Sequence, residues 1–265
     1  MRPQKGWSAI RFSGLLMACL FATEANGSDP PPGYLQGAPL DYAVPKPPDD
    51  PSVIQMELVQ VRAAQELPTS SQWLEANADA MAYSPDEVIR RFDDASGEIL
   101  EPSTRVVLVS MLSRVIQDTR LYAGEAKKAT PRPRPYIEDK NITPCNIAFL
   151  NDQESYPSGH AMNGYVVASV LSQVIPSRRQ PILARGIRYG DNRVVCGVHH
   201  PSDVVEGRML GIAYLKALEA NSDFQADLKC AVEEEGHLSA NKTALSKKCA
   251  ARTRAIMKSN ASGRR

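Results

Sequence analysis

Apolar residues recur every three or four positions along most of the chain after residue 51, and this spacing predicts helices. The runs 52–67 and 84–100 both show it, and the second opens with the Ser-Pro-Asp signal of a helix start. The longest run, 103–129, is apolar over much of its circumference, which favours a central place in a helical bundle. Further helices are expected over 158–174, 177–189, 201 to beyond 215, 223–240 and 245–259. No alternating pattern of convincing strand length stands out, so the predicted fold class is all-α.

Basic residues precede a short apolar stretch at the N-terminus, Phe12–Ala22, and small residues follow at positions 25–27. This order is typical of a cleaved secretory signal, so residues 1–27 are predicted to be a signal peptide. An uncleaved membrane anchor is a competing interpretation, but the apolar stretch is far below the roughly 20 residues that span a bilayer. Lipidation at Cys19 is a third, because the residues before it faintly resemble a lipoprotein box.

Proline dominates residues 28–51, which predicts an extended arm that wraps the surface rather than a helix. The remainder, 52–265, is long enough for one substantial core, so we expect a single-domain helical bundle. The formal net charge of +1 carries no signature of nucleic-acid binding. We also expect no membrane span in the mature chain.

Removal of the signal leaves four cysteines, Cys145, Cys196, Cys230 and Cys249. An even number in an exported chain suggests two disulfides, and three pairings are open on paper. Closeness in sequence favours Cys230 with Cys249, which leaves Cys145 with Cys196. Metal ligation is the competing use, but the chain has no C-x-x-C pair and the spacings match no zinc pattern. We therefore expect a periplasmic or secreted protein without a cysteine-bound metal.

A histidine opens a helix in the stretch Tyr-Pro-Ser-Gly-His of residues 156–160. Ser158 is a good helix cap, and Gly159 lets a ligand approach the backbone closely. Free N–H groups at a helix start, together with the positive end of the helix dipole, form an anion site, and His160 stands beside it. A capped helix with an ordinary, partly buried histidine also fits this tetrapeptide.

His199 and Asp203 lie four positions apart at another helix start, where Pro201 is the expected first helical residue. A carboxylate bonded to one ring nitrogen fixes the tautomer and directs the lone pair of the other, as a nucleophilic histidine needs. Arg193 could offer a planar fork of donors to phosphate-like oxygens. His200 is off the spacing to Asp203 and is interpreted as a pocket-rim residue. A helix-capping His and Asp with a solvated arginine is the plainer alternative.

Lys127 closes the long central run, and Arg134 follows in a loop framed by prolines. This arrangement predicts two fixed positive charges near one spot at a low entropic cost. In isolation such a stretch also fits a solvated basic turn.

Together the three segments resemble the three-part signature of the type 2 phosphatidic-acid-phosphatase and vanadium haloperoxidase superfamily. The matching residues, in order, are Lys127, Arg134, Pro135, Pro157, Ser158, Gly159, His160, Arg193, His199 and Asp203. Residues 100–235 further resemble the class A bacterial non-specific acid phosphatases. The sequence departs from that pattern at Asn192, where serine is usual, and at Ala161, where threonine is common. The resemblance implies that 52–265 is an all-helical acid phosphatase domain.

The resemblance also implies roles for these residues. His199 would attack phosphorus to form a phosphohistidine, oriented by Asp203, and His160 would protonate the leaving group and then activate water. The phosphoryl oxygens would be held by positive or N–H groups of Lys127, Arg134, Ser158, Gly159 and Arg193. Small phosphomonoesters are the implied partners, with phosphotransfer as a side activity. Because several cations can neutralise the phosphate, we expect no cofactor, and because His160 must be protonated while His199 is neutral, we expect an acidic pH optimum. A homo-oligomer is a further expectation.

Other functions remain open at this stage. A vanadate-dependent haloperoxidase uses the same oxyanion pocket, although the short chain argues against it. A lipid phosphatase of the same superfamily is disfavoured by the lack of a predicted span. A phosphate-binding protein without catalysis would not need a histidine nucleophile with its carboxylate.

Overall fold

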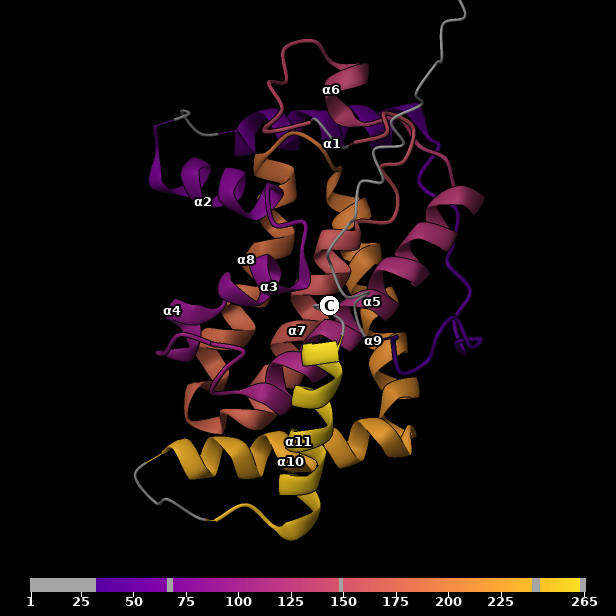
Figure 1. Ribbon diagram of the computed structural model, residues 1–265. Coiled ribbons are helices and arrows are strands. Elements are labelled where there is room, and N and C mark those ends of the chain that lie inside the picture. Colours follow the sequence, from indigo (N-terminus) through magenta and orange to yellow (C-terminus); the bar gives the residue numbers. More distant parts are fainter. Residues whose placement is uncertain (1–31, 66–68, 148–149, 240–243, 263–265) are drawn as a thin grey trace, which may run out of the picture.

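The computed structural model describes residues 32–65, 69–147, 150–239 and 244–262, and helices make up nearly all of its regular structure (Figure 1). Within these residues the one extended pairing is an isolated bridge between Arg132 and Glu154. The all-α prediction is therefore confirmed. The predicted signal peptide 1–27, with Cys19, lies outside the described residues.

The helices follow one another with short connections. Their bounds are α1 (Pro51–Ala64), α2 (Ser71–Ala80), α3 (Pro85–Arg90), α4 (Asp93–Ser96), α5 (Val106–Ala129), α6 (Pro135–Glu138), α7 (Gly159–Val174), the 3₁₀ turn η1 (Pro176–Arg178), α8 (Arg179–Val195), α9 (Pro201–Glu219), α10 (Ser222–Leu238) and α11 (Lys247–Ser262).

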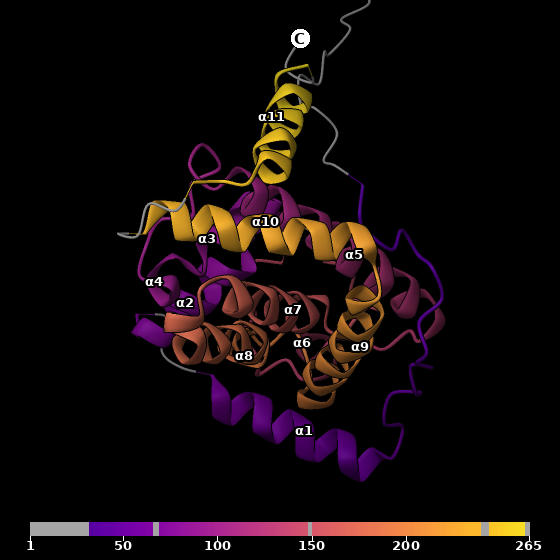
Figure 2. The same cartoon turned by 90° about the horizontal axis from the view of Figure 1, so that it is seen from below.

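Helix α7 lies at the centre and packs against α5, α8, α9 and α10 (Figure 2). Its contact with α8 is close because two glycines face each other. A Cβ atom on Gly164 would lie 2.7 Å from the carbonyl oxygen of Gly186, and one on Gly186 would lie 2.5 Å from that of Gly164. Side chains at either position would push the helices apart. The glycines therefore fix the separation of α7 and α8 near their functional ends.

Helix α1 lies on the outside of the bundle, against α8 and α9 (Figure 2). Leu58 and Val61 of α1 are buried in a second apolar cluster with Val195, Cys196 and Val198. The main cluster occupies the space between α5, α7 and their neighbours. The second cluster thus joins the N-terminal helix to the segment that carries His199.

Residues 32–50 form no helix or strand, but they are anchored to the bundle. The backbone N–H groups of Tyr34, Leu35 and Gln36 donate to the Asp118 carboxylate on α5, at 2.7–2.9 Å. The Tyr34 hydroxyl donates to Asp227 on α10 at 2.6 Å. Buried carboxylates of the bundle therefore hold this segment in place.

Several helix boundaries differ from the expected ones. The run 84–100 gives two short helices, α3 and α4, which are separated at Arg91 and Phe92. Gly97 adopts a left-handed conformation (φ 80°) and ends α4. Helix α8 continues to Val195, six residues past its expected end, so Asn192 and Arg193 lie on a helix. Helix α2 and the short α6 had not been predicted.

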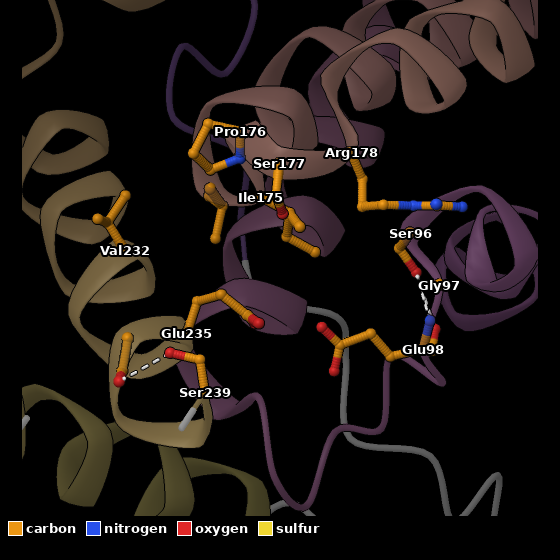
Figure 3. A pocket seen from close by; sticks show the side chains of 12 residues that line it. Ser96, Gly97, Glu98, Ile175, Pro176, Ser177, Arg178, Val232, Glu235 and Ser239 are labelled. Atoms are coloured by element: carbon orange, nitrogen blue, oxygen red, sulfur yellow. Dashed lines mark hydrogen bonds between the residues drawn. The ribbon is translucent and has the colours of Figure 1, made fainter. Parts of the chain in front are cut away.

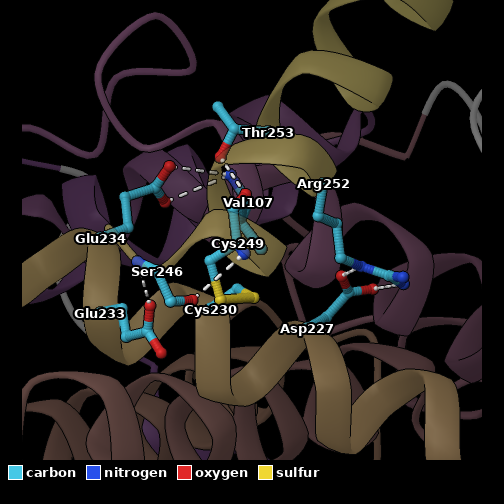
Figure 4. Close-up of a disulfide and its surroundings, with 9 residues drawn as sticks. All are labelled: Val107, Asp227, Cys230, Glu233, Glu234, Ser246, Cys249, Arg252 and Thr253. Carbon is cyan, nitrogen blue, oxygen red and sulfur yellow. Dashed lines mark hydrogen bonds and ion pairs between the residues drawn. A yellow bond between two sulfur atoms is a disulfide. The ribbon is translucent and has the colours of Figure 1, made fainter. Parts of the chain in front are cut away.

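Both expected disulfides are present, Cys145–Cys196 and Cys230–Cys249. The second joins α11 to α10, where Arg252 of α11 also pairs with Asp227 (Figure 4). Nearby, the Glu234 carboxylate accepts hydrogen bonds from the N–H groups of Val107 and Leu108 at the start of α5. Helix α10 thereby caps α5, which has no capping side chain of its own. In the part of the chain described here, no helix has the length and apolarity needed to cross a bilayer.

Candidate active site

The predicted site residues meet at one end of the bundle, where α7 and α9 begin and α8 ends (Figure 1). The loop after α5 reaches the same place. Its Arg132 N–H donates to Gln153 O at 2.8 Å, and the Ser155 N–H donates to Arg132 O at 3.1 Å. Ser158 N–H in turn donates to Asp203 O at 2.8 Å. Backbone bonds therefore hold the three signature segments together.

His199 is buried, and Nδ1 of its ring lies 3.3 Å from Oδ2 of Asp203 in the first turn of α9. Its other nitrogen, Nε2, lies 3.4 Å from Nη1 of Arg134. Burial lowers the pKa of His199 well below its ordinary value, and the charges of Arg134 and Lys127 lower it further, while the hydrogen bond to Asp203 acts in the opposite direction. The ring is thus held neutral, with the carboxylate favouring the proton on Nδ1 and the lone pair on Nε2.

The Asp203 carboxylate is fully buried and has four partners. Besides His199, it accepts from the His200 N–H at 2.8 Å, from the Ser155 hydroxyl, and from Arg132 Nη1 at 2.6 Å. Burial raises the pKa of Asp203, but the hydrogen bond and charge of His199 together with the charge of Arg132 outweigh this and hold it well below its usual range. Asp203 is therefore an anion throughout the working pH range of most enzymes.

Arg132 had not been predicted as a site residue, yet it connects the His199–Asp203 pair, which we call the relay, to α1. Its Nη2 donates to Glu57 Oε2 at 2.7 Å, and both side chains are buried. The same Glu57 carboxylate accepts from the Ser202 N–H at 2.8 Å. Arg132, Glu57 and Ser155 thus orient Asp203 from behind. The sequence offered little sign of the role of Arg132, because Arg132 and Arg134 lie in the same proline-framed stretch. Only their contacts in the folded protein distinguish the two arginines.

Arg134 points its guanidinium at the ring of His199. Three backbone carbonyl oxygens accept from it, those of Asn151 (2.7 Å), Val198 (2.8 Å) and Glu154 (2.9 Å). These bonds fix the plane of the guanidinium and neutralise no charge. Arg134 is therefore a buried, oriented cation directly beside Nε2 of His199.

Lys127 lies in the last turn of α5 and reaches the same pocket. Its Nζ donates to the carbonyl oxygens of Glu154 at 2.6 Å and Ser155 at 3.3 Å. Burial, followed by the charge of Arg134, lowers the pKa of Lys127 to about 7. The ammonium thus changes charge close to neutral pH, and a bound anion would favour its protonated form.

Arg193, in the last turn of α8, is 1% exposed. Its Nε and Nη1 atoms have no hydrogen-bond partner among the described residues. Burial, and next the charge of Arg134, lowers the pKa of Arg193 to about 10. A buried guanidinium with unpaired donors is costly unless an anion accepts from it, so this position is suited to an oxyanion.

Ser158 caps α7, and its Oγ accepts from the Ala161 N–H at 3.3 Å. Its own N–H is used by Asp203, so the backbone donors at this helix start are those of Gly159 and His160. No acceptor for these two groups is found in the described parts of the chain. The helix cap is as predicted, while the N–H groups without an acceptor are those of Gly159 and His160 rather than those of Ser158 and Gly159.

His160 stands in the first turn of α7, with its ring stacked on Tyr189 of α8 at 5.6 Å between ring centres. Its Nε2 atom is buried and has no partner among the described residues. Burial lowers the pKa of His160 well below its ordinary value, and the charges of Arg193, His199 and Lys127 lower it further. Tyr189 thus fixes the ring plane, a contact for which no local pattern of residues is a signal.

His200 is not a pocket-rim residue, as had been predicted, but is completely buried. Its Nε2 lies 3.0 Å from Oε2 of Glu138, which belongs to the unpredicted helix α6. The spacing argument considered α9 alone, whereas the ring contacts a side chain of α6. Asn192, which replaces the usual serine, is also buried, and its Nδ2 donates to Asp79 at 2.8 Å and Glu75 at 3.1 Å on α2.

A cavity of about 290 Å³ opens beside His160, between α5 and α7. We call it the α5–α7 cavity; its lining residues are Ala82, Tyr83, Arg120, Ala123, Gly124, Lys127, Gly159, His160 and Asn163. A larger cavity of about 580 Å³ lies at the opposite end of α7, among Ser96, Ile175, Arg178 and Glu235 (Figure 3). It holds none of the predicted site residues. Across the described ranges, no three or more His, Cys, Asp or Glu side chains are grouped to hold a metal ion.

Comparisons with known proteins point to one superfamily. The sequence profile of the PAP2 superfamily matches residues 104–221. An acid phosphatase from Zymomonas mobilis is 32% identical over 231 residues, 86% of each chain. A non-specific acid phosphatase from Salmonella typhimurium is 34% identical over 168 residues, 62% of this chain and 67% of the relative. A shorter match, 34% identical over 97 residues, is to a lipid A 1-phosphatase from Rhizobium etli; it covers 34% of this chain and 40% of the relative.

Proposed function

The chain belongs to the PAP2 superfamily, and on that premise we propose that it is an exported non-specific acid phosphatase that hydrolyses phosphate monoesters through a phosphohistidine, without a metal ion. The observation that carries the proposal is the environment of His199. Asp203 lies at one ring nitrogen, and Arg134 lies 3.4 Å from the other. A neutral, oriented imidazole facing cations suits attack on an anionic phosphoryl group.

In the first step, Nε2 of His199 bonds to phosphorus and the bond from phosphorus to the ester oxygen breaks. The imidazole becomes positive, and the Asp203 carboxylate beside Nδ1 stabilises that charge. Arg132 and Ser155 keep the carboxylate in position. This step needs His199 neutral beforehand, and its lowered pKa supports this.

The transferring phosphoryl group carries its charge on three oxygens. Arg134, Arg193 and Lys127 surround the place where they would lie, and the N–H groups of Gly159 and His160, with the Ser158 hydroxyl, add neutral donors. Cations and helix N–H groups of this kind stabilise the charge that spreads in the transition state. They offer the neutralisation that a metal ion gives in other phosphatases.

His160 would donate a proton to the departing ester oxygen. In the phosphate-free protein its pKa is lowered by burial and by Arg193, His199 and Lys127. A phosphoryl dianion among those cations offsets their effect, so substrate binding raises the pKa of His160 and brings in the proton that catalysis needs. The neutral ring then accepts a proton from the water that attacks the phosphohistidine, which releases phosphate. An alcohol in place of water gives phosphotransfer.

Export is supported by two disulfides and by the leader-like first 27 residues. The disulfide between Cys145 and Cys196 lies next to the site, since Cys196 is three residues from both Arg193 and His199. Such a bond persists in an oxidising compartment such as the periplasm.

Hydrolysis of p-nitrophenyl phosphate at about pH 5–6 with EDTA present tests the activity, with His199→Ala as the inactive comparison. Quenching in alkali and peptide mapping would locate the phosphoryl group on His199, because phosphohistidine survives base. Wild-type activity that EDTA abolishes would contradict the metal-free mechanism. Inactivity of the folded wild type toward phosphate esters, with halide oxidation after vanadate addition, would favour the haloperoxidase.

A further inference from the structure

The α5–α7 cavity starts at two proposed catalytic groups, His160 and Lys127, and continues away from them along α5. Its α5 wall consists of Arg120, Ala123, Gly124 and Lys127. Residues at this spacing share one helix face, and seven positions correspond to two turns, about 10 Å along the axis. The cavity therefore leads from the phosphoryl pocket toward Arg120.

The middle of this wall leaves room for a ligand. A Cβ atom added to Gly124 would meet nothing within 4 Å. The opposite wall is formed by Gly159, His160 and Asn163 of α7. His160, the proposed proton donor to the ester oxygen, thus borders the space into which the departing alcohol would extend.

Arg120 is partly buried and, like Arg134 and Arg193, forms no ion pair with a carboxylate among the described residues. Its Nη2 donates to Tyr83 O at 2.5 Å, and no acid within the described residues forms an ion pair with it. By contrast, Arg132 pairs with Glu57 and Arg185 with Asp79. The cavity lining contains the basic side chains of Arg120 and Lys127 and no acidic one. Such a lining favours an anionic occupant.

We propose that the α5–α7 cavity receives the leaving group and that Arg120 binds a second anionic group on it. The preferred substrates are then phosphomonoesters whose alcohol part carries a carboxylate or a further phosphate about two helical turns from the reacting phosphorus. This inference rests on the proposed phosphatase function. Arg120 would then determine which leaving groups the enzyme prefers, a role different from that of the cations that hold the reacting phosphoryl group.

Two aryl phosphates of equal size test this point, 4-carboxyphenyl phosphate and 4-carbamoylphenyl phosphate. At about pH 6 the first leaving group is anionic and the second neutral. We expect wild-type kcat/KM to favour the carboxylate by about tenfold at low salt, and sodium chloride to reduce this ratio. Arg120→Gln should lower the ratio about tenfold, and Arg120→Lys should retain part of it. Lys128→Gln, an exposed charge removal on the same helix, is the matched control and should leave the ratio unchanged.

The outcomes separate the inference from the function on which it rests. A wild-type ratio near one, or a ratio that Arg120→Gln and Lys128→Gln lower equally, overturns the role of Arg120 while hydrolysis itself stands. No hydrolysis of either ester by the wild type removes the phosphatase proposal as well. If Arg120→Gln does not fold, Arg120→Lys decides the matter: a ratio equal to that of the wild type overturns the role of the Arg120 guanidinium, and a ratio lowered part of the way supports it.

Discussion

Nη1 of Arg132 lies 2.6 Å from Oδ1 of Asp203, and its other terminal nitrogen lies 2.7 Å from Glu57 on α1. The carboxylate of Asp203, next to the proposed nucleophile, thus pairs with Arg132, and Arg132 in turn pairs with Glu57 of the N-terminal helix α1. The sequence suggested a pair, His199 and Asp203. In the structure this pair continues through Arg132 to Glu57, so four residues are connected by direct contacts.

Arg132→Met should reduce kcat/KM on the order of 100-fold and destabilise the fold by about 3–5 kcal/mol, because two buried carboxylates lose their partner. Arg132 lowers the pKa of Asp203, so its removal raises that pKa and moves the acid limb of the kcat/KM profile to higher pH. Arg62→Met, an exposed arginine on α1, is the control. An unshifted acid limb would indicate that Arg132 only stabilises the fold.

Sulfate should bind more tightly below pH 7 than above it. The pKa of Lys127 is lowered to about 7, so the ammonium is protonated at about pH 6 and largely neutral at about pH 8.5, while sulfate stays a dianion throughout. The expected change in affinity is on the order of tenfold, seen as a smaller sulfate-dependent rise in Tm at the higher pH. Lys127→Met should weaken binding and remove the pH dependence, whereas Lys128→Met should do neither. A pH-independent rise in the wild type would show that Lys127 keeps its charge.

His160→Gln should lower kcat/KM by roughly 10²- to 10⁴-fold for alkyl phosphates, because an alkoxide leaves poorly without a proton. The loss should be smaller for p-nitrophenyl phosphate, whose leaving group departs as an anion. The phosphohistidine should accumulate in this variant, since water activation is also lost. His237→Gln, an exposed histidine on α10, serves as the control. Equal losses for both esters would contradict a role as proton donor.

Loss of either disulfide should lower the stability of the protein, but only loss of Cys145–Cys196 should lower its activity. Each double serine variant should lose about 2–4 kcal/mol of stability, and the loss should be larger for Cys145–Cys196, whose loop spans 51 residues against 19 for Cys230–Cys249. Removal of Cys145–Cys196 should also lower kcat, because Cys196 lies between Arg193 and His199. Removal of Cys230–Cys249, which joins α10 to α11 (Figure 4), should leave kcat/KM within about twofold. Equal losses of kcat would contradict this division.

Much of the site was predictable because its residues lie at fixed spacings at the starts and ends of helices. Asp203 lies four positions after His199, about one helical turn, and the two side chains are in contact in the structure. His200 was placed wrongly: it is buried and lies 3.0 Å from Glu138 of α6, a helix that the sequence pattern did not predict. Arg132 and Arg134 look alike in the sequence, and their different partners follow from the backbone pairing of 132 with 153–155. Tertiary contacts of this kind leave no local signal.

The link from Glu57 to Asp203 also bears on how the enzyme becomes competent during folding. The main apolar cluster of the central helices contains no residue of α1. The series of contacts from His199 to Glu57, in contrast, is complete only once Glu57 has docked on Arg132 and on the Ser202 N–H. Activity should therefore be acquired late, after most of the helical signal has returned, so that enzymatic rate reports the arrival of the N-terminal segment rather than the formation of the bundle.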